Sequence, residues 1–140
     1  MIKGAVQIEQ WQEVFKSQIP KDQYAVMLQH SESQGLILNL QSQKYQVVID
    51  FGVVSAFRVV DEGMILNDVA QDKTMLSYRE TKFKNVIYRI TGGDFSEYIR
   101  HIGGNLYDLL ELKHYLVVSE NYVFDVITAW EPELEVTEKK

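Results

Sequence analysis

The chain has 140 residues, of which 46% are hydrophobic and 24% charged, so we expect a single globular domain over residues 1–140. It has no cysteine, which excludes disulfides and thiolate chemistry, and its net charge of −6 disfavours nucleic-acid binding, because that affinity depends on neutralising phosphates. No apolar run approaches the roughly 18 residues that span a bilayer, and no signal-peptide core is found, so we expect a cytoplasmic protein without a membrane partner.

The first predicted element is a short amphipathic helix over residues 8–18, which ends before Pro20. Ile8, Trp11 and Phe15 fall near helical spacing, with polar residues between them. We expect Trp11 and Phe15 to pack in the core.

A meander of short strands is predicted next. Residues 24–29 (YAVMLQ) and 36–40 (LILNL) are rich in strand formers and are separated by the turn-rich hexapeptide HSESQG. A short connection at residues 42–44 then leads into the longest strand-like stretch. Strands joined by such short polar links pair with their neighbours in antiparallel fashion.

The stretch from Tyr45 to Gly63 is expected to be the structural spine. Seven of the eight odd positions from Tyr45 to Val59 are apolar, so the alternation of a strand predicts a buried odd face. Gly52 lies near the middle, where glycine marks a bulge or bend, so we expect two strands or one bent strand. The turn at residues 61–63 (DEG) ends the stretch and is a candidate functional surface.

Residues 64–83 show no clean period and are predicted to be irregular. A strand is expected at residues 86–90, followed by a helix that Asp94 opens as N-cap, with Glu97 as its capping-box partner. Two glycines end this helix before a second helical turn that Asn105 caps. The predicted helix has one apolar face, made of Phe95, Tyr98, Ile99 and Ile102.

Residues 114–118 and 122–127 are predicted to form a hairpin. Asp125 has the opposite parity to its apolar neighbours, so we expect it to face solvent or a partner. From about Pro132 the chain is rich in glutamate, and we expect a frayed acidic tail. The elements together predict an α+β fold with a mainly antiparallel sheet of six or seven strands and two or three short helices.

No catalytic or metal-binding motif is found in the sequence. The three histidines lack metal-site spacing, and the acidic series after residue 61 does not match an EF-hand loop. Ser96, His101 and His114 could form a nucleophilic site only if the fold brings them together, and we expect His114 to make a structural hydrogen bond instead. We therefore predict no metal and no cofactor.

The segment Trp130-Glu131-Pro132-Glu133 has two interpretations. Trp130 could close the core at the end of a strand. Alternatively, the segment forms a partner-facing edge, since an aromatic residue beside a polar rim is common at protein interfaces.

Three segments, VVIDFGVVSAFRVVDEG, DFSEYIRHIG and HYLVVSENYVFDVITAWEPELEV, follow one another in the chain. In this order the chain resembles the small bacterial immunity proteins, or antitoxins, of polymorphic toxin systems, above all those encoded beside LXG-type secreted toxins. The resemblance implies a protein that is not an enzyme and that binds and neutralises a cognate protein toxin. Many such toxins are nucleases with basic clefts, which suit an acidic inhibitor.

The resemblance transfers no functional residues, so the candidate binding surface is chosen by charge and expected exposure: Asp61, Glu62, Asp68, Asp72, Asp125 and Glu131. Two other functions stay open, a small-ligand-binding or sensor module and an enzyme with a site of Asp, Glu and His. A deep apolar pocket would favour the ligand module, and a shallow acidic face would favour the inhibitor. A homodimer is also left open.

Overall fold

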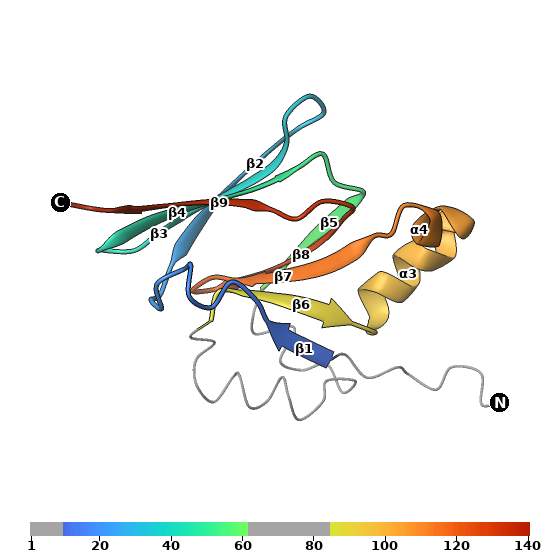
Figure 1. Ribbon diagram of the computed structural model, residues 1–140, viewed down its shortest axis with the longest axis horizontal. Coiled ribbons are helices and arrows are strands. Elements are labelled where there is room, and N and C mark those ends of the chain that lie inside the picture. Colours follow the sequence, from blue (N-terminus) through green and yellow to red (C-terminus); the bar gives the residue numbers. More distant parts are fainter. Residues whose placement is uncertain (1–9, 62–84) are drawn as a thin grey trace.

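The structure is a computed structural model, which describes residues 10–61 and 85–140. Within these residues the chain forms nine strands and two helices (Figure 1). The strands are β1 (Gln10–Glu13), β2 (Ala25–Ser31), β3 (Gly35–Gln41), β4 (Tyr45–Gly52), β5 (Ala56–Asp61), β6 (Ile87–Thr91), β7 (Lys113–Val118), β8 (Tyr122–Thr128) and β9 (Glu133–Glu138), and the helices are α3 (Asp94–Gly103) and α4 (Asn105–Leu109). The segment 64–83, predicted to be irregular, lies outside the described residues.

The described strands form two antiparallel sheets. One has five strands in the order β1-β6-β7-β8-β5, and the other has four in the order β2-β3-β4-β9. The predicted meander is confirmed as β2-β3-β4, and the predicted hairpin as β7-β8. The α+β character is confirmed too, but six or seven strands in one sheet is wrong, because β1 and β9 add to the count and the strands divide between two sheets.

The predicted break near Gly52 is where the chain passes from one sheet to the other, since β4 and β5 belong to different sheets. Gly52 has a φ of 69°, a conformation that favours glycine. Gly35, with a φ of 80°, packs directly against it, and a Cβ atom at Gly35 would lie 1.9 Å from the Gly52 carbonyl oxygen. This corner therefore requires glycine at position 35.

The main core lies between the two sheets. The odd face of β4 is buried as predicted: Val47, Ile49 and Phe51 are at most 1% exposed. The alternation does not continue into β5, where Val59 is 43% exposed. The reason is that β5 is an edge strand of the other sheet: Phe57 still packs partly buried against the main core, but Val59, farther along this edge, is left exposed.

The helix predicted over residues 8–18 is wrong in its described part. Residues 10–13 form β1, which pairs with β6, and Phe15 has a φ of 56°, which no helix accommodates. The core positions are confirmed, because Trp11 is buried with its ring centroid 5.1 Å from that of Tyr88, and Phe15 packs partly buried against the main core. Spacing that fits a helix over four residues fits a short strand as well.

The helix after β6 is confirmed, but its predicted cap is wrong. Gly93 occupies the N-cap position and Asp94 is the first helical residue, so the capping box does not form. Instead the backbone N–H of Glu97 donates to the Gly93 carbonyl, and the Ser96 hydroxyl donates to the Gly92 carbonyl at 2.9 Å. Gly104, rather than Asn105, likewise precedes α4 as its N-cap. Neither described helix is long and apolar enough to cross a membrane.

The predicted frayed tail is wrong for residues 133–138. They form β9, which pairs along β4 from Asp50↔Glu133 to Tyr45↔Glu138. Leu134 packs against the main core from this strand. The acidic segment is therefore an edge strand whose glutamates are exposed to solvent.

Candidate partner-binding surface

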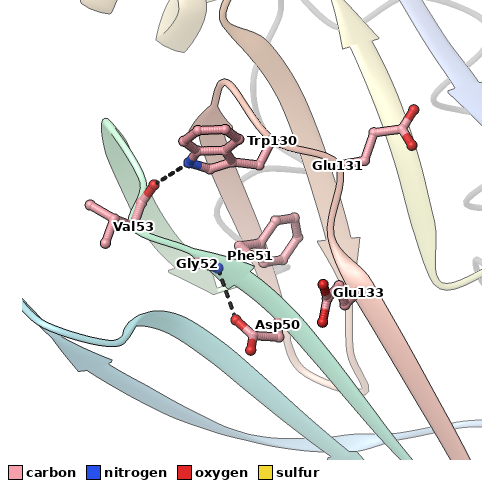
Figure 2. Close-up of a pocket in the computed structure, with 7 residues that line it drawn as sticks. All are labelled: Asp50, Phe51, Gly52, Val53, Trp130, Glu131 and Glu133. Carbon is pink, nitrogen blue, oxygen red and sulfur yellow. Dashed lines mark hydrogen bonds between the residues drawn. The ribbon is translucent and has the colours of Figure 1, made fainter.

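An open hollow of about 490 Å³ lies where the β8–β9 connection passes the end of β4. Figure 2 shows the indole of Trp130 on one side of it and the end of β4 on the other. The hollow combines an aromatic face, a stretch of backbone and three carboxylates. We call it the Trp130 hollow, and it is lined by Asp50, Phe51, Gly52, Val53, Trp130, Glu131 and Glu133.

Trp130 is held in place although most of its surface faces solvent. Its side chain is 60% exposed, so it does not close the core, and that interpretation is wrong. The indole Nε1–H donates to the Val53 carbonyl at 3.2 Å, and the backbone N–H donates to the Thr128 hydroxyl at 3.3 Å. These bonds fix an apolar surface that a partner would otherwise have to order, which lowers the entropy cost of binding.

The charge of the Trp130 hollow is negative. Asp50 accepts the backbone N–H of Gly52 at 2.9 Å, while Glu131 and Glu133 are exposed, and no ion pair is found for any of the three among the described residues. The hollow therefore favours cations.

A second exposed surface lies on the two helices. The predicted apolar face of α3 is buried only in part: Phe95 is buried, but Tyr98 and Ile102 are each 60% exposed. Lys113 of β7 pairs with Thr128 of β8, so α4 and the segment with Trp130 leave the sheet at the same end. Two leucines of α4 and the leucine that follows it are exposed as well. This end therefore carries five large exposed apolar side chains: Tyr98, Ile102, Leu106, Leu109 and Leu110.

Asp125 does not face solvent, which corrects the prediction made from its parity. It is 1% exposed, and its Oδ1 accepts a hydrogen bond from Nε2–H of His114 at 2.6 Å. Its Oδ2 accepts from Arg58, whose Nη2 lies at 2.9 Å and Nε at 3.0 Å. The ring of Phe95 covers this cluster, 4.5 Å from the Arg58 guanidinium carbon. Asp125 is therefore a structural residue that a partner does not reach.

The other predicted binding residues that the structure describes do not form one surface. Asp61 is exposed at the end of β5, opposite Tyr122 of β8, and is not part of the Trp130 hollow. Glu62, Asp68 and Asp72 lie outside the described residues. Of the three candidates that the structure describes, only Glu131 lines the hollow. Glu133 belongs to the segment 130–133 that the sequence offered as a partner-facing edge. The sequence prediction missed Asp50, because the pairing of an interior β4 residue with a tail residue has no local signal.

The described residues assemble no catalytic site. Ser96 donates to backbone carbonyls, His101 is exposed and His114 is 2% exposed, so these three residues do not converge on a cleft. The predicted structural hydrogen bond of His114 is confirmed. Its Nδ1 has no partner among the described residues, but His114 lines neither of the two described hollows. No group of three or more potential metal ligands occurs in the described part of the chain.

The second hollow, of about 680 Å³, lies at the other end of β4. It brings Lys44 and Lys139 together with Asp22 and Glu120, so its charges balance. A hydrogen bond from Ser42 is the largest cause that lowers the pKa of Asp22. This hollow has no aromatic side chain in its lining and selects no sign of charge.

Comparisons of this chain with protein-family models, curated proteins and solved structures give no match.

Proposed function

We propose that this chain is a non-enzymatic inhibitor, an immunity protein that binds a basic surface of a cognate protein toxin. Trp130 is the observation that carries the proposal. Its indole is 60% exposed, is fixed by a hydrogen bond to Val53, and stands in a hollow with three carboxylates that form no ion pair with any other described residue. Tryptophan is enriched among residues that dominate binding energy, and an acidic rim selects a basic partner.

In the proposed complex, lysine or arginine side chains of the toxin lay their apolar stems on the Trp130 ring. Glu131 and Glu133 accept hydrogen bonds from the charged ends of those side chains. The net charge of −6 accelerates association with a basic surface at low ionic strength. A toxin that needs its basic cleft for a nucleic-acid substrate is blocked when the inhibitor covers that cleft.

The proposal predicts that a toxin is encoded beside the gene, and the test is co-expression with that product, followed by co-purification, growth rescue and a measured dissociation constant. We expect Trp130→Ala to weaken binding by about 100-fold or more, because it removes the aromatic anchor. We expect the double change Glu131→Lys, Glu133→Lys to slow association by about 10-fold and to reduce its dependence on salt.

The matched control is the double change Glu135→Lys, Glu138→Lys. It alters the net charge by the same amount, but Glu135 pairs with Val48 and Glu138 with Tyr45, farther along β4 from the Trp130 hollow than Glu133. A control that weakens binding as much as the hollow variants would refute this surface. If the wild-type chain forms no complex and gives no rescue, the inhibitor function itself is wrong.

A small-ligand-binding module is the second candidate, favoured by the size of the Trp130 hollow. Its volume of about 490 Å³ falls within the range of roughly 300–1,000 Å³ typical of small-molecule sites. An indole face with carboxylates around it fits a cationic ligand. Saturable quenching of Trp130 fluorescence by free arginine in the isolated protein would support this candidate, and its absence would favour a protein partner.

A further inference from the structure

Strand β2 forms an outer edge of the four-stranded sheet. Its seven residues pair with β3 on one side, from Ala25↔Gln41 to Ser31↔Gly35. Among the described residues, no strand and no other backbone hydrogen bond occupies its outer side. Figure 1 shows the β2–β3 hairpin extending beyond the strands of the other sheet. The outer N–H and C=O groups of β2 can therefore pair with another chain.

The other three edges carry the features that prevent such pairing. The sequence of β9 is ELEVTE, with three glutamates, β5 contains Arg58 and Asp61, and β1 has only four residues. Charged side chains and short length are the usual means by which soluble proteins block edge-to-edge association. The sequence of β2, AVMLQHS, contains no proline and no aspartate, glutamate, lysine or arginine. Among the edges formed by described residues, it is the longest and the one that carries none of these protective features.

We propose that β2 pairs in antiparallel fashion with β2 of a second copy of this chain, joining the two four-stranded sheets into one continuous sheet. A two-fold axis through Leu28, the middle residue of β2, places each residue opposite one of the same parity. Met27 then lies opposite Gln29 of the second copy. Beyond the strand, Glu32 lies opposite Tyr24, and Asp22 opposite Gln34. No two like charges meet in this register, so the strand is complementary to itself.

The two faces of β2 also match in this arrangement. Val26 and Leu28 pack partly buried against the main core, so the even positions face inward. Met27 is 64% exposed on the opposite face. A two-fold axis perpendicular to the sheet places the core-facing side chains of the two copies on the same face of the joined sheet. Met27 then lies beside outer-face side chains of the second copy. An edge pairing of seven residues is a small interface, so we expect a dimer that dissociates on dilution.

The experiment measures the mass of the full chain by light scattering and sedimentation, at concentrations from about 10 µM to about 1 mM. The expected result is a shift from the 16.3 kDa monomer toward twice that mass as concentration rises. The double variant Met27→Glu, Gln29→Glu places two like-charged pairs in direct opposition and should stay monomeric. The variant Met27→Lys, Gln29→Glu places opposite charges in the same register and should restore the dimer.

Circular dichroism and thermal unfolding show whether each variant is folded, so that loss of the dimer is distinguished from loss of the fold. A wild-type chain that stays monomeric at the highest concentration overturns the proposal. So does a dimer that Met27→Glu, Gln29→Glu leaves intact, or a folded Met27→Lys, Gln29→Glu variant that fails to dimerise. These measurements need no toxin, so their outcome is independent of the proposed inhibitor function.

Discussion

Asp125 connects three secondary-structure elements through one carboxylate. Its two oxygens accept hydrogen bonds from His114 of β7 and Arg58 of β5, while Phe95 of α3 covers the group. A buried carboxylate with partners at both oxygens holds its neighbours in one geometry. Removing it leaves the His114 imidazole buried without its hydrogen-bond acceptor.

We predict that Asp125→Ala lowers the free energy of unfolding by about 3 kcal/mol, because it breaks a buried ion pair and leaves its partners uncompensated. Urea unfolding followed by circular dichroism measures this loss. Glu120→Ala, which removes an exposed carboxylate from the β7–β8 turn, should stay within about 0.5 kcal/mol of the wild type. Equal effects of the two substitutions would contradict the structural role of Asp125.

The sequence could not show that Asp125 is buried. Asp125 alternates with Phe124 and Val126, and this predicts an exposed side chain only if one face of the strand is open to solvent. In the structure Phe124 and Val126 face the core between the sheets, while the opposite face of β8 carries Val123 and Ile127 in two further buried clusters. When helices cover the outer face of a sheet, alternation no longer separates core from surface.

At the level of elements, two glycines offer opposite tests. Gly35 has a φ of 80° and its missing Cβ would overlap the Gly52 backbone, whereas a Cβ at Gly103, the last residue of α3, would meet no atom within 4 Å. We predict that Gly35→Ala lowers the free energy of unfolding by more than about 2 kcal/mol. We predict that Gly103→Ala raises it by about 0.5–1 kcal/mol, because alanine loses less conformational entropy in a helix.

Both variants can be measured by urea or thermal unfolding under the same conditions. A Gly35→Ala protein as stable as the wild type would mean that the corner at Gly52, where the chain leaves β4, can relax. Destabilisation by Gly103→Ala would mean that the end of α3 requires glycine after all.

Interior strands were predictable because short, nearly continuous apolar runs between turn residues indicate buried strands, as in residues 36–40 and 114–118. The edge strands were not. In β1, Trp11 and its neighbours satisfy helical spacing as well as strand spacing over so few residues. In β9, Leu134 and Val136 alternate with glutamates, a strand pattern that the high charge concealed. The Trp130 hollow was half predictable, since Trp130 and Glu131 are adjacent in sequence but Asp50 joins them only through the β4–β9 register.

At the level of the whole molecule, β9 completes the four-stranded sheet. We predict that truncation after Pro132 abolishes cooperative unfolding or lowers the midpoint temperature sharply, because it removes six residue pairs with β4 and the packing of Leu134. The truncated chain should also aggregate, since it exposes the edge of β4. Removal of Lys140 alone is the control and should leave the melting curve unchanged. A truncated chain that unfolds like the wild type would mean that β9 contributes little.

The β4–β9 pairing also has a consequence for the folding rate. It joins residues that lie far apart in the sequence, such as Asp50 and Glu133. Loop-closure entropy must be lost before such contacts form, so topologies of this kind fold slowly compared with helical proteins of the same size. During synthesis, β2, β3 and β4 emerge well before the strand that protects β4. Until β9 arrives, the nascent meander has two unprotected edges, and this interval is when the chain depends most on chaperones.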